Sequence, residues 1–211
     1  MRQRITTETQ FNGSPIRATE NYPVIGNIIE GLQAHLTYMR RRHAQVLYAS
    51  LVLKYPVGYY PANPTGNVSS TMRKLHQKAQ RENVEIMTDW TMENSSAGST
   101  HFNIIIFADG TKLQSGYRLK SWLDGIWSRE IGVLPESGYV HLNANNPNCF
   151  PPAAAIGLAP SYELRLRRNS PHEQTMADNI ANAASYYAKI RSKENISSGC
   201  RSFDFSQIPQ K

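Results

Sequence analysis

The sequence predicts an α+β fold in which an antiparallel sheet with a βαββαβ order of elements has its helices packed on one face. Two apolar, strand-like runs at 84–92 and 100–107 are separated by a short polar connection, as in an antiparallel hairpin. Segments with helical spacing of apolar residues precede and follow this hairpin. The chain has 211 residues, 40% of them hydrophobic, which suits one domain of ordinary size.

Three elements are predicted before the hairpin. Residues 1–23 are polar and lack periodicity, so we expect a flexible N-terminal arm. Residues 24–43 show helical spacing and end in three arginines, and residues 46–56 are rich in strand formers with apolar side chains on both faces. Residues 68–82 are predicted to form a basic helix capped by Ser or Thr.

Further elements are predicted after the hairpin. Residues 117–132 have apolar side chains on one helical face, and residues 138–143 form a short strand. The Pro/Asn/Ala-rich segment 143–160 is long for a bare loop, so it should wrap the surface or carry function. The last helix is predicted over about 172–191, where apolar residues again recur at helical intervals.

The composition limits the class of protein. We expect a main domain over 24–191 and a basic C-terminal tail over 192–211. The chain has a formal charge of +7, which favours a polyanionic partner, with nucleic acid as the leading candidate. Cys149 and Cys200 are too few for a disulfide framework, so we expect reduced thiols and a cytoplasmic location. The sequence shows neither a membrane-spanning run nor a signal peptide, so no membrane contact is expected.

A candidate metal site lies in the hairpin, where the second strand begins with STHFNIIIF at 99–107. Successive side chains of a strand alternate between faces, so His101 and Asn103 share one face. Glu93 ends the preceding strand and can be their neighbour across the turn. A carboxylate, an imidazole and an amide oxygen together suit Mg²⁺ or Mn²⁺. The alternative is a histidine that bonds to backbone beside an incidental glutamate.

A candidate nucleophile lies in SYYAK at 185–189. Tyr186 and Lys189 are three positions apart and would share one face of a helix. A phenol with an ordinary pKa of about 10 needs a nearby cation to attack a phosphate, and Lys189 can supply it. Tyr187 falls on the apolar stripe and is the poorer candidate. The alternative places Tyr187 in the core and leaves Tyr186 and Lys189 in solvent.

Basic residues in two groups could neutralise the phosphate charge of a bound DNA strand. They are Arg73, Lys74, Lys78, Arg165, Arg167 and Arg168. Trp90, Phe102 or Tyr117 could stack on bases if exposed, although aromatic residues such as Trp90 and Phe102 are more often part of a core.

In order and spacing, these motifs resemble the inovirus gene-two-product family together with the YagK/YfjJ C-terminal domain family. The resemblance spans residues 45–205 and rests on the following matches: Trp90, Glu93, His101, Phe102, VHL at 140–142, RNSP at 168–171, Ser185, Tyr186, Ala188, Lys189 and GCRSF. That family is similar to the HUH endonucleases, which comprise rolling-circle replication initiators and relaxases. The resemblance therefore implies an HUH/Rep, RRM-like version of the α+β core.

The resemblance also implies a role for each candidate residue. His101 would be a metal ligand, Glu93 the third ligand, Tyr186 the nucleophile and Lys189 the cation that orients the phosphate. Asn103 stands where the family's second histidine belongs. The chain thus departs from the family pattern at one ligand.

The function expected from this reading is metal-dependent nicking and joining of single-stranded DNA, which initiates rolling-circle replication of a phage, prophage or satellite element. A host helicase and polymerase would be partners, because the sequence lacks a GxxxxGK[ST] phosphate loop. One alternative is a catalytically weakened Rep-fold protein that binds DNA or regulates a mobile element. Another is a protein-interaction factor that uses residues 147–160.

Overall fold

A computed structural model describes residues 4–59, 61–94, 100–142, 163–190, 193 and 201–209. The core is an antiparallel sheet of six strands in the order β10-β6-β7-β5-β8, with β9 also paired to β5. Its strands are β5 (Gln45–Lys54), β6 (Ile86–Asn94), β7 (Thr100–Asp109), β8 (Val140–Leu142), β9 (Glu163–Arg167) and β10 (Phe203–Phe205). Its helices are α1 (Gly26–Arg42), α2 (Pro64–Arg81), α3 (Gly116–Ile131) and α4 (Glu173–Ser185).

The path from β5 to β8 runs β5-α2-β6-β7-α3-β8 along the chain. In space β7 lies between β5 and β6, and every pairing within the sheet is antiparallel. β8 and β9 share one edge of β5, with β8 opposite Leu51–Leu53 and β9 opposite Gln45–Ala49. The predicted α+β class with an antiparallel sheet is therefore confirmed.

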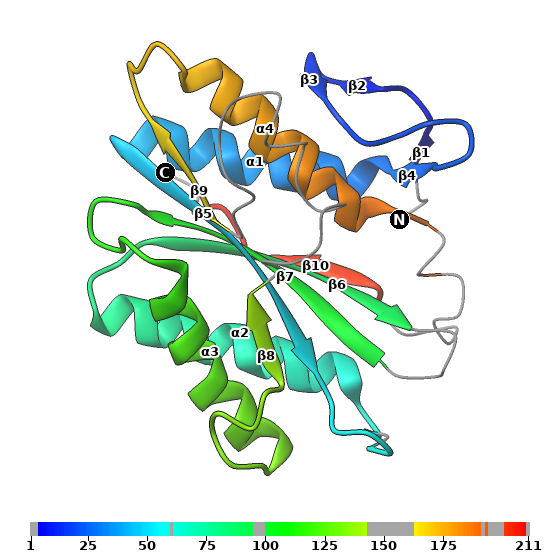
Figure 1. The fold of residues 1–211 in the computed structure, drawn as a ribbon, viewed down its shortest axis with the longest axis vertical. Coiled ribbons are helices and arrows are strands. Elements are labelled where there is room, and N and C mark those ends of the chain that lie inside the picture. Colours follow the sequence, from blue (N-terminus) through cyan, green and yellow to red (C-terminus); the bar gives the residue numbers. More distant parts are fainter. Residues whose placement is uncertain are drawn as a thin grey trace.

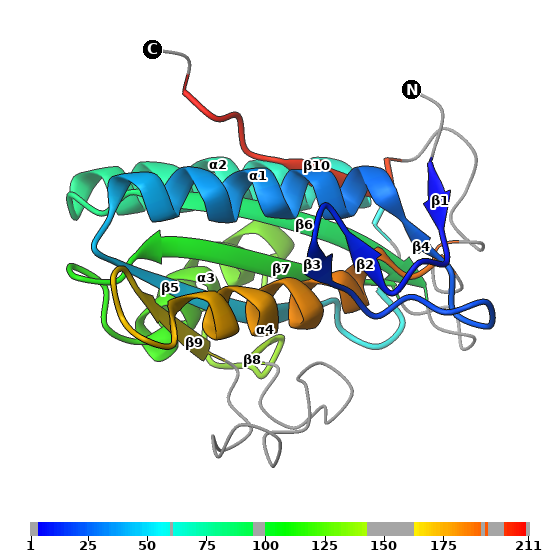
Figure 2. The same ribbon diagram turned by 90° about the horizontal axis from the view of Figure 1, so that it is seen from above.

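The expectation that the helices pack on one face of the sheet is wrong. Helices α2 and α3 cover one face, whereas α1 and α4 cover the other (Figure 1). The reason lies in the strands, since β7 directs Ile104 and Ile106 toward α2 and α3 and the alternate residues Ile105 and Phe107 toward α1 and α4. Two apolar faces need two layers of helices. Figure 2 shows α1 and α4 side by side over the second face.

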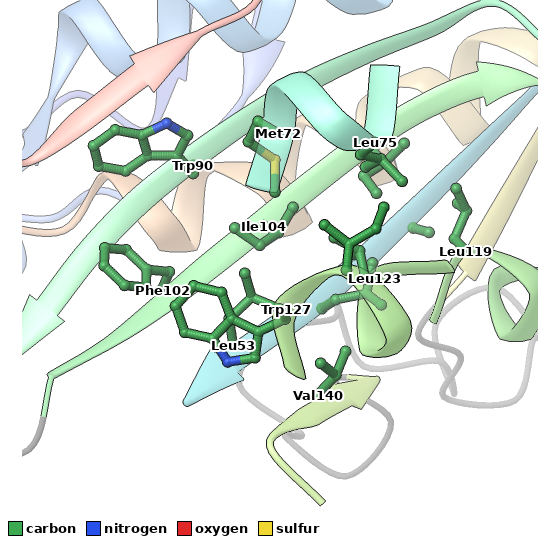
Figure 3. Packing of buried hydrophobic residues seen from close by; sticks show 14 of the residues in the cluster. Leu53, Met72, Leu75, Trp90, Phe102, Ile104, Leu119, Leu123, Trp127 and Val140 are labelled. Carbon is green, nitrogen blue, oxygen red and sulfur yellow. The ribbon is translucent and has the colours of Figure 1, made fainter. Parts of the chain in front are cut away.

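The face beneath α2 and α3 holds an aromatic core. Trp90 and Phe102 are 3% and 0% exposed, so they belong to the core and do not offer stacking surfaces for bases. Their rings meet edge to face at 5.9 Å, and Phe102 meets Trp127 in the same manner at 6.0 Å (Figure 3). Trp127 also donates a 2.8 Å hydrogen bond from Nε1 to the carbonyl of Lys54. Tyr117, in contrast, is 62% exposed.

Both terminal segments, the predicted arm and the predicted basic tail, contain short strands in the described structure. Residues 4–25 form the short strands β1 (Ile5–Thr6), β2 (Gln10–Phe11), β3 (Ser14–Pro15) and β4 (Val24–Ile25), and Phe11 and Ile16 are buried in the core beside α1 and α4. At the other end β10 pairs with β6. The described parts of both segments therefore pack on the domain.

Several boundaries also differ from the prediction. Helix α2 begins at Pro64, and its cap is Asn63, whose side chain accepts a 2.9 Å hydrogen bond from the amide of Gly66. Helix α4 ends at Ser185 and continues as a 3₁₀ turn over Tyr186–Ala188. The 143–160 segment lies outside the described residues. Among the described helices, none has the length and apolar character needed to cross a membrane.

Candidate active site

Glu93 and His101 face each other across the β6–β7 hairpin. The register pairs these two residues directly, and His101 Nε2 lies 3.4 Å from Glu93 Oε2. Both side chains project from the face covered by α1 and α4, because they alternate in step with Met87 and Ile105 of that core. The Glu93 side chain is 5% exposed and that of His101 is 27% exposed. The carboxylate is thus buried, and the imidazole stands at the edge of the site.

Asn103 continues the same row toward the middle of the sheet. It lies between Thr91 on β6 and Val52 on β5, and it is 6% exposed. Within the described part of the chain, Asn103 Nδ2, Thr91 Oγ1 and Glu93 Oε1 are buried without a hydrogen-bond partner. Buried polar atoms usually have partners, so these three atoms could bond to a polar ligand. In the described residues, Thr71 Oγ1 and Ser128 Oγ on the opposite side of the domain are likewise without a partner.

The 3₁₀ turn after α4 brings Tyr186 and Lys189 to this row. Lys189 Nζ lies 3.1 Å from Glu93 Oε2 and 4.0 Å from the ring centre of Tyr186. A β-bridge between Lys189 and Val24 holds the end of the turn. Tyr186 is partly exposed, and it packs against the core that α1 and α4 cover. The structure therefore brings Glu93, His101, Tyr186 and Lys189 together.

Tyr187 packs into the core, as its place on the apolar stripe predicts. It is 1% exposed, and its hydroxyl forms a short hydrogen bond with the hydroxyl of Ser50 on β5. Its ring meets that of Tyr186 edge to face at 5.5 Å. Two adjacent tyrosines thus differ in role, because Tyr187 anchors the turn to the sheet and Tyr186 remains at the surface of the site.

Lys193 is a component of the site that sequence reasoning missed. Its side chain is 4% exposed, and Nζ donates to the carbonyls of Tyr187 at 2.7 Å and Lys189 at 3.0 Å. The same ammonium group lies 3.8 Å from Glu93 Oε1. The only sequence signal is a lysine four positions after Lys189, and such a pair is ordinary in a basic tail. Lys193 therefore links the backbone carbonyls of the turn to Glu93.

The charges of these groups are strongly coupled. Burial alone would raise the pKa of Glu93, but the hydrogen bond from His101 and the charges of Lys193 and Lys189 lower it to about 2. Burial acts to lower the pKa of Lys189, yet the charge of Glu93 and the Tyr186 hydroxyl raise it overall. Burial lowers the pKa of Lys193 to about 8. Glu93 is therefore a permanent anion with two cationic neighbours.

Glu93, His101 and Asn103 offer the donor types that a hard divalent cation prefers. A carboxylate, an imidazole nitrogen and an amide oxygen lie on one sheet face, and Glu93 Oε1 has no hydrogen-bond partner in the described structure. No group of three or more His, Cys, Asp or Glu side chains in the described residues could hold a metal, so the third side chain would be the amide of Asn103. Lys189 and Lys193 compete with such a cation for Glu93.

The predicted nucleic-acid contacts lie away from this site. Arg73, Lys74 and Lys78 are on α2, which covers the opposite face of the sheet. Lys74 and Lys78 form ion pairs with glutamates at 2.5 and 2.6 Å.

The three arginines of the second group lie at the other end of the sheet, near β9. Arg165 and Arg167 pair with the start of β5, whereas His101 pairs with its last residue. The nine residue steps of β5 from Gln45 to Lys54 span roughly 30 Å at ~3.3 Å per residue. Arg168 follows β9 and is exposed. The structure does not bring either basic group to Tyr186.

Comparison of this chain with protein-family models, curated proteins and solved structures finds no match. The geometry of the site is therefore the basis for its chemistry. The cation, the carboxylate, the imidazole and the phenol come from β6, β7 and the turn after α4. This constellation suits reactions of a phosphodiester, because it combines a phenol, an adjacent cation and hard donor atoms.

Proposed function

We propose that this protein is a metal-dependent endonuclease that nicks and rejoins single-stranded DNA with Tyr186 as the nucleophile, and that it initiates rolling-circle replication of a phage, prophage or satellite element. The observation that carries the proposal is the convergence of Tyr186, Lys189, Glu93 and His101 at one end of one sheet face. The β5-α2-β6-β7-α3-β8 segment is proposed to be an HUH/Rep, RRM-like core, which its strand order supports. The proposed setting is the bacterial cytoplasm, with a host helicase and polymerase.

In the proposed reaction, the Tyr186 oxygen attacks the scissile phosphorus and the bond from phosphorus to the 3′ oxygen breaks. A phosphotyrosine forms. The phenol loses a proton, and the leaving 3′ oxygen gains one and becomes a hydroxyl. Lys189 Nζ, 4.0 Å from the Tyr186 ring, stabilises the phenolate and the phosphate charge as they develop. Attack by the 3′ hydroxyl reverses these steps and rejoins the strand.

The metal would be Mg²⁺ or Mn²⁺, held by Glu93, His101 and Asn103, and it supplies Lewis-acid polarisation of the phosphate. The chain itself does the positioning. The cross-strand register fixes Glu93 beside His101, and the Val24 bridge fixes Lys189. Lys189 is shared between Glu93 and Tyr186, so it can move its charge toward an incoming phosphate without leaving the site.

The test is a covalent adduct on a denaturing gel. The protein is incubated in Mn²⁺ with 3′-labelled single-stranded oligonucleotides that tile the neighbouring genome, so that the fragment joined to Tyr186 carries the label. Tyr186→Phe should abolish the adduct. Tyr117→Phe, a change at an exposed tyrosine outside the site, should leave it unchanged. An adduct that persists in Tyr186→Phe removes Tyr186 from the role.

A second candidate function is a Rep-fold protein that binds DNA or regulates a mobile element without cutting. It is favoured by Asn103 in place of a second histidine and by the two lysines that already neutralise Glu93. Calorimetric titration with Mn²⁺ separates the two functions. Binding that is lost in His101→Ala supports the endonuclease, whereas no binding in either protein supports the second candidate.

A further inference from the structure

A basic groove lies between α2 and α3, on the face of the sheet opposite to Glu93 and His101. Its volume is about 380 Å³, and it is open to solvent along the outer surface of the two helices. Lys74, Lys78 and Arg81 line it from α2, and Arg129 lines it from α3. None of these residues takes part in the site around Tyr186.

Positive charge is concentrated on this pair of helices. Residues 64–82 and 116–131 contain seven basic and three acidic side chains, which leaves four of the chain's seven net positive charges. Glu82 and Glu130 each neutralise part of the groove by pairing with Lys78 and Lys74. The third acid, Asp124, is buried and accepts a hydrogen bond from the amide of Glu136. The surplus therefore faces solvent.

Two arginines supply the unpaired charge of the groove. Arg81 and Arg129 are exposed, and within the described part of the chain they have no acidic partner. Arginines of this kind are free to form bidentate contacts with phosphate.

The aromatic side chain in the groove is already engaged. Trp122 is half-buried, with Lys78 Nζ 5.6 Å and the Arg118 guanidinium 5.2 Å from its ring centre. Proteins that bind single strands without sequence preference use exposed aromatic faces on which bases stack. This groove offers cations from two helices and an aromatic ring that is covered by cations. Its chemistry therefore suits phosphates on the outside of a duplex, where bases are already stacked.

We propose that the α2/α3 groove binds duplex DNA through its phosphates, separately from the strand that reaches Tyr186. The sheet stands between the two surfaces, so a single strand bound at Tyr186 cannot also lie in the groove without passing round the sheet edge. The proposal rests on the proposed function only in naming DNA as the polyanion. Duplex held in this way would be the double-stranded region next to the nicked strand.

The test measures binding apart from cleavage. Fluorescence anisotropy is recorded in EDTA with a labelled 20-base-pair duplex and with a single strand of the same length, over a range of salt concentrations. The wild-type protein should bind the duplex more tightly than the single strand. The double variant Arg81→Glu, Arg129→Glu should lose at least tenfold in duplex affinity. Its slope of log affinity against log salt should fall by about 2, because each phosphate contact contributes about 0.9.

The control is a double variant of equal charge, Arg41→Glu, Lys112→Glu, whose residues are exposed and lie outside the groove. It should bind duplex within about twofold of wild type. Equal losses in the two double variants, or tighter wild-type binding to the single strand, would overturn the proposal. Nicking of a short single strand should survive in the groove variant. Absence of nicking with intact duplex binding counts against the proposed endonuclease and leaves the groove proposal standing.

Discussion

Replacing Lys193 with methionine tests how the Tyr186 turn is held on the sheet. The ammonium group donates to the carbonyls of Tyr187 and Lys189 at 2.7 and 3.0 Å and lies 3.8 Å from Glu93. Methionine fills nearly the same volume without donors or charge. We therefore expect the turn to lose two carbonyl bonds and one of its two ionic contacts with Glu93, while the contact of Lys189 with Glu93 and the fold survive.

The expected change in stability is small because two contributions oppose each other. One buried and one partly buried carbonyl lose their donor, which costs about 1–3 kcal/mol each. Against this, burial and the charge of Lys189 hold the pKa of Lys193 at about 8 rather than 10.5. A shift of about 2.5 units corresponds to roughly 3 kcal/mol of penalty that disappears with the charge. The free energy of unfolding should therefore change by an amount between a gain of about 1 kcal/mol and a loss of about 3 kcal/mol.

The assays are urea unfolding followed by circular dichroism and the rate of adduct formation by Tyr186. Lys193→Met should cut that rate at least tenfold, and Lys193→Arg should restore part of it because arginine keeps the donors. Lys54→Met, at an exposed lysine, is the matched control for stability. A wild-type rate in Lys193→Met would refute the positioning role. A loss of more than about 4 kcal/mol would refute the opposing-contributions argument.

Further predictions concern the packing of the two helical layers. Gly31→Ala places a Cβ about 2.5 Å from the Phe205 ring, so it should cost about 1–3 kcal/mol in urea unfolding, whereas in a Phe205→Ala background the same change should gain up to about 1 kcal/mol. Burial acts to lower the pKa of His35, but the hydrogen bond and charge of Asp89, 2.7 Å away, raise it above 6.5. The pairing of protonated His35 with Asp89 therefore stabilises the fold fully below pH 6.5, and this stabilisation is lost as pH rises through the raised pKa. Unfolding measured from pH 6 to 9 should show that loss in wild type, and an equal slope in Asp89→Asn would contradict the assignment. Trp127→Phe should cost about 2 kcal/mol in the same assay, since it removes a buried hydrogen bond to the last carbonyl of β5 and leaves a cavity.

The part of the site that lies on the β6–β7 hairpin can be predicted from the sequence. Period-two alternation puts His101 and Asn103 on one face, and a short polar connection makes Glu93 the cross-strand neighbour of His101. The helical spacing likewise indicates α1 and α3 within a few residues of their ends. These features are local, so a single segment contains the information.

The other half depends on contacts between distant segments. The sequence predicts a helix through residue 191, but α4 ends at Ser185, and the 3₁₀ turn that follows directs Lys189 to Glu93. The helical prediction still pairs Tyr186 with Lys189, because residues three apart also meet in a 3₁₀ turn. Nothing local identifies Lys193, whose partner Glu93 lies 100 residues earlier.

The prediction of helices on one face is wrong for a related reason. The both-sided apolar pattern of the strand at 46–56 indicates burial on two faces, and only the packed structure shows that both faces are covered by helices. β9 and β10 are only five and three residues long, and each owes its place to a neighbour, β5 or β6, rather than to its own pattern. Short edge strands of this kind carry little periodicity, so tertiary pairing decides them.

The arrangement of charge at the site bears on which of the two proposed functions holds. Glu93 supplies one negative charge, and Lys189 and Lys193 supply two positive charges at pH 7, so these three groups carry a net positive charge. Such a site attracts a DNA phosphate before any divalent cation binds. Both the endonuclease and the non-cutting protein should therefore bind DNA, and DNA affinity cannot distinguish them. The two functions differ in whether a metal ion can displace an ammonium group from Glu93. Metal binding is therefore the property that distinguishes them.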